Sequence, residues 1–161
     1  MAESTPPGAF VEIGVYKGGS AWHLAQAAIR QDRQLYLYDT FSGMPFADPG
    51  DSHSVGDFRD TSLESVQAAI PSAHCVVGTF PDSLVDMGPV AFVHADCDQY
   101  RSVHDVATLL PPLMVDGGII VFDDYGCLDA ATRAVHDVLG TPELNKSGKA
   151  FVRVCGGARA Q

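Results

Sequence analysis

Two short apolar runs that end in acidic residues constrain the fold of this 161-residue chain more than any other feature. Residues 119–122, Ile-Ile-Val-Phe, follow Gly117 and Gly118 and run directly into Asp123 and Asp124. Four apolar residues between turn formers predict a strand that is buried on both faces, as in a parallel sheet. The acids then lie at the carboxyl end of the strand, where open α/β sheets place their ligands.

Residues 90–95 form a second apolar run, which ends at Asp96. If the two runs are neighbouring parallel strands, about 4.8 Å apart, then Asp96, Asp123 and Asp124 converge on one small volume. Two carboxylates about 4 Å apart repel by roughly 4 kcal/mol at an effective dielectric constant near 20. Either one acid is then protonated or a cation lies between them. Oxygen ligands without a nearby His or Cys pair favour a hard cation such as Mg²⁺. The alternative is that these acids cap the helices that follow the strands.

The charge and composition of the chain limit its function. With 46% apolar and 19% charged residues, it has the composition of a globular protein. The formal net charge of −10 argues against a nucleic-acid or anionic-membrane surface. No apolar run approaches the roughly 20 residues of a membrane span, and the first residues lack the features of a signal peptide, so we expect a cytoplasmic protein. The four cysteines include no C-x-x-C pair and predict neither disulfides nor zinc.

Strand-like and helix-like segments alternate along the chain without repeats. We expect a polar lead-in over residues 1–8, one domain over 9–155 and a tail over 156–161. Within the domain, the expected strands are residues 9–13, 34–38, 75–77, 89–95, 119–122 and 150–155, and the expected helices are 21–30, 61–70, 102–110 and 129–139. Trp22, Ala25 and Ile29 share one stripe of the first helix, which predicts its apolar face. The alternation predicts an α/β protein with a doubly wound, mostly parallel Rossmann-like sheet.

A glycine-rich turn follows the first expected strand. It runs from Glu12 through Gly14 and Gly18 to Ser20, and the second expected strand ends at Asp39. This is the layout of a nucleotide-type site, in which glycines admit a close ligand and a carboxylate holds a ribose diol. The spacing differs from G-x-G-x-x-G, which argues against an NAD-linked oxidoreductase. The acid two residues before the first glycine instead suits S-adenosylmethionine.

The segment between the second strand and the second helix, residues 40–60, is long and irregular. Long segments without regular structure inside a domain are typical of lids and binding loops. The segment contains His53, and histidine is the side chain best suited to proton transfer near neutral pH. A solvated loop histidine is the alternative.

Five stretches of the sequence, taken together and in this order, carry a family resemblance. They are residues 10–21, 38–45, 78–84, 94–100 and 117–126. The combination resembles the macrocin O-methyltransferase (TylF/MycF) family of class I S-adenosylmethionine-dependent enzymes, which methylate sugar hydroxyls of natural products with Mg²⁺. The similarity extends from residue 9 to about residue 139. Family members carry a helical segment before the first strand, so the class I core is N-terminally short here, which leaves the substrate class open.

The resemblance implies a role for each candidate site residue. The cofactor-binding residues are Glu12, Gly14, Gly18 and Ser20 beside the methionine moiety, Asp39 at the ribose, Gly78, Thr79 and Phe80 near the adenine, and Asp96. The metal ligands are Asp96, Asp123 and Asp124. The family uses a histidine from the loop after the second strand as general base, and His53 is the nearest candidate, with His94 and Gln99 as the fallback candidates.

The function expected from the sequence is therefore an S-adenosylmethionine- and Mg²⁺-dependent O-methyltransferase. A bound Mg²⁺ lowers the pKa of an acceptor hydroxyl and orients it, and a base takes the proton. The expected acceptor is a small molecule, a sugar of a natural product. One alternative is a catechol-type O-methyltransferase, with Phe41, Phe46 and Phe58 lining an aromatic pocket. Another is a non-catalytic S-adenosylmethionine-binding domain. We expect no nucleic-acid or membrane partner, and a homo-oligomer in which a neighbouring subunit supplies the lid is possible.

Overall fold

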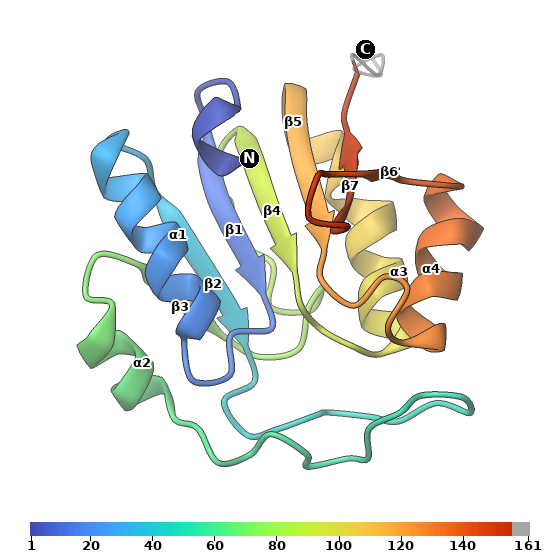
Figure 1. The fold of residues 1–161 in the computed structure, drawn as a ribbon. Helices are drawn as coiled ribbons and strands as arrows, with labels where there is room; N and C mark the ends of the chain where they lie inside the picture. Colours follow the sequence, from blue (N-terminus) through green and yellow to red (C-terminus); the bar gives the residue numbers. More distant parts are fainter. Residues whose placement is uncertain (156–161) are drawn as a thin grey trace.

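The computed structural model describes residues 1–155, which form a seven-stranded sheet with helices on both faces (Figure 1). The strands are β1 (Ala9–Ile13), β2 (Leu35–Asp39), β3 (His74–Val77), β4 (Val90–Ala95), β5 (Met114–Phe122), β6 (Glu143–Leu144) and β7 (Ala150–Arg153). The helices are α1 (Gly19–Arg30), α2 (Leu63–Ala69), α3 (Tyr100–Leu109) and α4 (Asp129–Leu139), with short 3-10 turns η1 (Ala2–Ser4) and η2 (Pro111–Leu113). The predicted α/β class is confirmed. The predicted tail, residues 156–161, lies outside the described residues.

The strand order is β3-β2-β1-β4-β5-β7-β6. Strands β1 to β5 are parallel, whereas β7 runs antiparallel to β5 and β6 antiparallel to β7. Ile13 pairs with Tyr38 and with Ala95, and Ala95 pairs with Phe122. The segments that follow these residues therefore leave the sheet at one edge. The chain order reverses direction between β1 and β4, which is the point where doubly wound sheets bind ligands.

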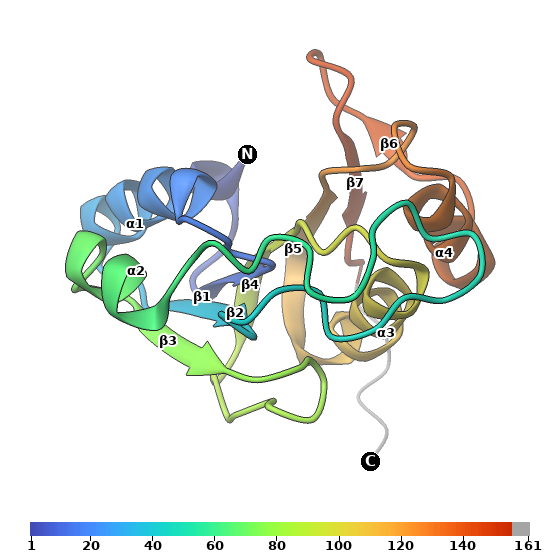
Figure 2. The same cartoon turned by 90° about the horizontal axis from the view of Figure 1, so that it is seen from below.

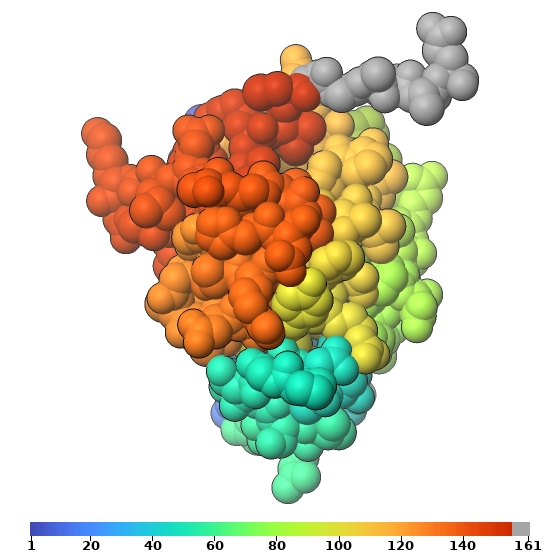
Figure 3. Space-filling view, turned by 90° about the vertical axis from the view of Figure 1, so that its right-hand side faces the viewer, coloured from blue at the N-terminus to red at the C-terminus, as the bar shows by residue number. Residues whose placement is uncertain are grey.

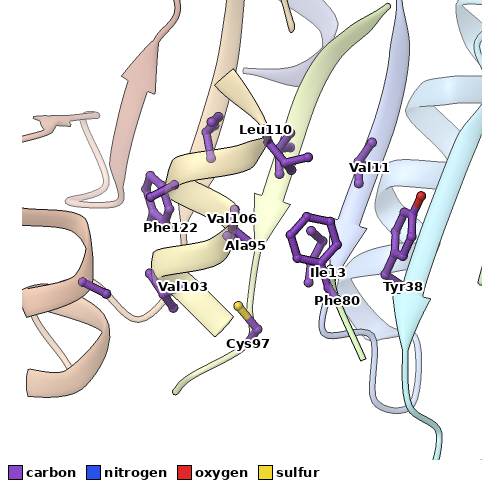
Figure 4. Close-up of a cluster of buried hydrophobic side chains, with 14 of the residues drawn as sticks. Val11, Ile13, Tyr38, Phe80, Ala95, Cys97, Val103, Val106, Leu110 and Phe122 are labelled. Carbon is purple, nitrogen blue, oxygen red and sulfur yellow. The ribbon is translucent and has the colours of Figure 1, made fainter. Parts of the chain in front are cut away.

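Two apolar clusters hold the helices against the sheet. On one face, α3 and α4 pack on a cluster that includes Val106, Ile120 and Ala134 (Figure 4). On the other face, α1 and α2 pack on a cluster that includes Phe10 and Val66. Burying apolar surface on both faces accounts for the near-continuous apolar sequences of β1 and β4. Among residues 1–155, no helix has the length and apolar character needed to cross a membrane.

Three predicted details of the elements are wrong. The fifth strand begins at Met114 and includes Gly118, because the chain pairs with β4 before the apolar run starts. A two-residue strand, β6, lies between α4 and β7, where the sequence predicts no strand. On α1 the buried face is made of alanines, whereas the side chains of Trp22 and Ile29 are 49% and 58% exposed. Small side chains let this helix approach the sheet closely, so the large apolar residues face outward.

The loop formed by residues 40–62 runs along the carboxyl edge of the sheet (Figure 2). It extends from the end of β2 to the ends of α3 and α4, against which it packs, and then returns to α2 (Figure 3). Ser62 is the N-cap residue of α2, and its Oγ accepts a hydrogen bond from the backbone N–H of Ser65 at 3.2 Å. The loop thus covers the edge where the strand-end acids lie.

Candidate functional site

A cleft of about 210 Å³ lies between this loop and the carboxyl edge of the sheet. Its walls come from the turn after β1, the end of β2, the loop, the turn after β3 and the turn after β4. Among the predicted cofactor residues, six line the cleft: Gly14, Asp39, Gly78, Thr79, Phe80 and Asp96. The three others, Glu12, Gly18 and Ser20, are not among the lining residues.

The turn after β1 approaches the turn after β4 closely. Gly14 has a φ of +87°, and a Cβ at this position would lie 1.8 Å from the backbone oxygen of Asp96. Only glycine fits both the backbone conformation and this approach. Gly18, with a φ of +84°, is the residue before α1 and starts the helix. The glycines of the turn therefore shape the cleft, one by close packing and the other by ending the turn.

Asp39 organises the backbone of the turn. Its Oδ2 accepts hydrogen bonds from the backbone N–H groups of Val15 and Tyr16, each at 2.8 Å, and its Oδ1 accepts one from Phe41 at 2.7 Å. A carboxylate has about four acceptor positions, so one on Oδ1 is left for another donor. The carboxylate is thus held rigidly at the cleft wall.

Acidic residues of the loop fix it to the rest of the protein at two places. Asp60 accepts hydrogen bonds from the hydroxyl of Tyr16 at 2.8 Å and from Nζ of Lys17 at 2.5 Å. Near the middle of the loop, Asp51 accepts from the backbone N–H of Tyr100 at 2.9 Å and so caps α3. Asp48 pairs with Arg101 at 2.9 Å. The loop therefore bridges the turn after β1 and the start of α3.

Asp96, Asp123 and Asp124 converge as predicted: one carboxylate oxygen from each lies within 4.8 Å of the other two. The capping alternative is wrong, because neither α3 nor α4 has a side-chain cap from its own N-cap residue, and the first N–H of α3 is capped by Asp51. Oδ2 of Asp124 is buried and has no hydrogen-bond partner among the described residues. A buried carboxylate oxygen without a partner is costly, and three converging acids form an oxygen donor set that fits a hard divalent cation.

One histidine, His94, lies beside these acids. Nδ1 of His94 lies 2.8 Å from Oε1 of Glu12, and Nε2 lies 3.5 Å from Oδ1 of Asp123. Glu12 is fully buried behind the ring. Burial opposes protonation of His94, but the hydrogen-bonding carboxylates of Asp123 and Glu12 raise its pKa to about 10. A protonated ring cannot accept a proton, so His94 is unsuited to the fallback role of general base.

Neighbouring cationic side chains lower the pKa of one acid of the site, whereas burial raises the pKa of two others. The hydrogen bonds from His94 and from Lys149, whose Nζ lies 2.6 Å from Oδ1 of Asp123, hold the pKa of Asp123 well below its usual range. Burial and the neighbouring carboxylates raise the pKa of Asp96 to about 6, although His94 opposes this. Burial and a hydrogen bond to Asp124 raise the pKa of Asp98 to about 8. At neutral pH Asp98 therefore keeps its proton whereas Asp96 is mostly ionised, and a bound cation would favour the ionised form of both.

The structure does not bring His53 to the acids. The ring of His53 packs edge-on against Phe58 at 4.9 Å, and its Nδ1 lies 3.9 Å from Asp57. Phe58 lines the cleft, so His53 lies one side chain behind the wall, and its role as base stays a prediction. Of the phenylalanines considered for an aromatic pocket, Phe41 packs against the core and Phe46 stacks under Arg101, which leaves Phe58 at the cleft.

Sequence reasoning missed Asp98, Tyr16 and Lys149 as site residues. Asp98 follows Asp96 by two residues, a spacing that could have identified it, and its φ of +57° turns it toward the cleft. Tyr16 lies within the glycine-rich turn and lines the cleft. Lys149 gave no local signal, since it reaches Asp123 only because β7 returns antiparallel to β5.

Comparisons with known proteins agree on one group of enzymes. A family model described as Macrocin-O-methyltransferase (TylF) matches residues 1–147. The chain is 32% identical over 156 residues to 8-demethyl-8-(2,3-dimethoxy-alpha-L-rhamnosyl)-tetracenomycin-C 4'-O-methyltransferase of Streptomyces olivaceus, which covers 83% of the chain and 59% of the relative. It is 30% identical over 166 residues to demethyldecarbamoylnovobiocin O-methyltransferase of Streptomyces niveus, covering 82% and 60%. The chain thus spans about three fifths of these relatives.

Solved structures share the fold. The O-methyltransferase NovP superposes with a TM-score of 0.79 at 24% identity, over 93% of the chain and 73% of NovP. The calicheamicin methyltransferase CalS11 gives a TM-score of 0.73 at 20% identity, over 91% and 72%. Aeropyrum pernix fibrillarin, solved with bound S-adenosyl-L-methionine, gives 0.55 at 15% identity, over 91% and 65%. The sheet is therefore that of class I methyltransferases.

Proposed function

The chain belongs to the macrocin O-methyltransferase (TylF) family, and we propose that it transfers a methyl group from S-adenosylmethionine to a hydroxyl of a small molecule. The observation that carries this proposal is the convergence of Asp96, Asp123 and Asp124 beside the cleft, with one carboxylate oxygen of Asp124 buried and unpaired. The two relatives named above are O-methyltransferases, and the name of one specifies a rhamnosyl-bearing compound. We therefore propose a sugar hydroxyl of a natural product as the acceptor.

The cleft wall offers separate contacts for the parts of the cofactor. Gly14 lets the turn after β1 lie close to the backbone of Asp96 and lines the part of the cleft proposed for the methionine moiety, and the open position on Asp39 accepts a hydrogen bond from a ribose hydroxyl. Thr79 and Phe80 border the adenine. The other three cofactor candidates support the cleft without lining it. Glu12 pairs with His94, and Gly18 and Ser20 lie at the start of α1.

Asp96, Asp123 and Asp124 would hold Mg²⁺. Bound there, the ion would lower the pKa of an acceptor hydroxyl and neutralise the acids. His94 and Lys149 keep Asp123 ionised and oriented for this role. We retain His53 as the proposed general base: Phe58 separates it from the cleft, so it acts only if the loop shifts when the acceptor binds.

Methyl transfer from labelled S-adenosylmethionine tests the proposal on a panel of sugar vicinal diols and catechols. We expect transfer to a diol, a loss of about 100-fold or more on adding EDTA, and recovery with Mg²⁺. Asp124→Asn should lose transfer to the same extent, whereas Asp137→Asn, on the exposed side of α4, should not. Activity that is indifferent to chelation and to Asp124→Asn contradicts the metal role. Cofactor binding without transfer to any acceptor favours a non-catalytic domain, and transfer to catechols alone favours the catechol-type alternative.

A further inference from the structure

Gln99 is a buried amide in the wall of the cleft. Its side chain is 1% exposed, and it occupies the N-cap position of α3. The backbone N–H of Gln99 donates to the carbonyl of Cys97 at 2.6 Å, and its own carbonyl accepts from the N–H of Val103 at 3.0 Å. The side-chain Nε2 donates to the backbone carbonyl of Phe46 in the loop. Backbone and side chain are therefore both fixed.

The other side-chain atom, Oε1, has no hydrogen-bond partner among the described residues. An amide oxygen and nitrogen are told apart by their partners. The carbonyl of Phe46 can only accept, so the NH₂ group must face it, because a flipped amide would place two oxygens together. The unpaired atom is therefore the oxygen. A buried acceptor without a donor is destabilising, so a donor is expected from outside the protein.

The chemistry of the side chain defines the role that remains. An amide takes up no proton near neutral pH, so Gln99 is excluded as the general base. The cleft wall that contains Gln99 also contains Cys97 and Phe80, which are buried and belong to one apolar cluster (Figure 4). A small number of oriented polar groups among apolar side chains is how small-molecule sites select a ligand group.

We propose that Gln99 is a specificity-determining residue, whose Oε1 accepts a hydrogen bond from an N–H or O–H group of the molecule bound in the cleft. Its Nε2 holds the loop through Phe46, so the same amide joins the ligand to the segment that covers the cleft. The inference rests on the proposed function for the two candidate donors, which are the amino group of the adenine and a hydroxyl of the methyl acceptor. The two sources can be told apart, because substitution of Gln99 should weaken binding of the cofactor in one case and of the methyl acceptor in the other.

Calorimetry with S-adenosylhomocysteine and S-inosylhomocysteine distinguishes them. In the inosine analogue a carbonyl replaces the amino group, so it would face Oε1 as a second acceptor. If adenine is the donor, the wild type should bind the adenosine form about tenfold or more tightly than the analogue, and Gln99→Met should lose most of this preference. Gln34→Met is the matched control, because Gln34 is exposed and its amide pairs with His74. This control should keep the wild-type preference.

If the acceptor is the source, Gln99→Met should keep the analogue preference and raise the KM for the acceptor about tenfold. Gln99→Glu provides a second variant, since it keeps an acceptor toward the ligand and loses the donor to Phe46; it should retain ligand discrimination. Unchanged analogue preference and unchanged acceptor KM in a folded Gln99→Met variant overturn the inference while the proposed function stands. A wild-type chain that binds no S-adenosylhomocysteine overturns both.

Discussion

The two halves of the sheet's carboxyl edge handle carboxylates in opposite ways. At the tips of β1 and β2, Asp39 is satisfied by three backbone N–H groups and holds a turn in place. At the tips of β4 and β5, the acids face one another, and one oxygen of Asp124 is unpaired. The carboxylate of Asp39 is thus fixed by the backbone alone, whereas the acids of the second half repel one another, and a cation would relieve that repulsion. The ends of β1 and β2 thus shape the proposed cofactor site, whereas the ends of β4 and β5 supply the carboxylates of the proposed metal site.

The two halves are in contact at Gly14, so Gly14→Ala should destabilise the protein more than any other substitution proposed here. Its Cβ would lie 1.8 Å from the oxygen and 2.6 Å from the carbonyl carbon of Asp96, in a backbone conformation that side chains disfavour. We expect a destabilisation of about 4 kcal/mol or more, seen as a fall in Tm of about 10 °C or more. The matched control is Gly19→Ala, where a Cβ meets nothing within 4 Å, and its Tm should be unchanged or higher. Equal stability of the two variants would show that the halves do not pack as described.

Asp39→Ala tests whether the first half is held by its carboxylate. Three partly buried N–H groups lose their acceptor, so we expect the free energy of unfolding to fall by about 2 kcal/mol. Denaturant titration measures this. Asp86→Ala is the control, since Asp86 accepts a single N–H, from Gly88, at an exposed turn, and it should change the free energy of unfolding by less than about 1 kcal/mol. A loss for Asp39→Ala no larger than that of the control would mean that the turn holds its shape unaided.

The pH dependence of stability tests the second half. The pKa values of Asp96 and Asp98 rise to about 6 and about 8 in the folded chain, above their ordinary values. Groups with raised pKa values stabilise the fold when protonated, and this contribution is lost as the pH rises through the folded value. The raised pKa of His94, about 10, acts in the same direction at higher pH. In EDTA, the Tm should therefore fall by about 5 °C between pH 5 and pH 8.

Two comparisons make this test specific. Asp98→Asn should flatten the fall in Tm above pH 6, whereas Asp137→Asn should leave it unchanged. Mg²⁺ should reduce the fall, because the ion binds the ionised carboxylates and so favours the folded state where they are charged. A Tm that rises from pH 5 to pH 8 in EDTA would show that the acids are already compensated within the chain.

The sequence predicts the fold well because the pattern that specifies it is local. Apolar runs bounded by turn formers locate β1, β4 and the end of β5, and the acids that follow them are placed by the register of parallel strands. The prediction fails where tertiary packing decides. The exposed side chain of Trp22 is one such case, since alanines on the same helix fit the close approach to the sheet. Lys149 is another, because its contact with Asp123 depends on how β7 returns.

The smallest expected effect is that of Lys149→Met. This substitution tests whether the ammonium group of Lys149 competes with Mg²⁺ for Asp123. Nζ of Lys149 lies 2.6 Å from Oδ1 of Asp123, but the side chains are 45% and 32% exposed. An ion pair this exposed contributes little to stability, so the free energy of unfolding should change by less than about 1 kcal/mol. Because the ammonium group competes for the oxygen that Mg²⁺ would use, Mg²⁺ affinity at low salt should rise about threefold, and the gain should shrink in high salt.

Lys146→Met, on the same turn between β6 and β7, is the control for lost surface charge, and it should leave Mg²⁺ affinity within about twofold of the wild type. If Lys149→Met instead lowers the affinity, the lysine orients Asp123 for the ion rather than competing with it. Either result defines how Lys149 affects the binding of Mg²⁺ at Asp123. If affinity does not change in either variant, Asp123 takes no part in binding the ion, and the second half would consist of Asp96 and Asp124 alone.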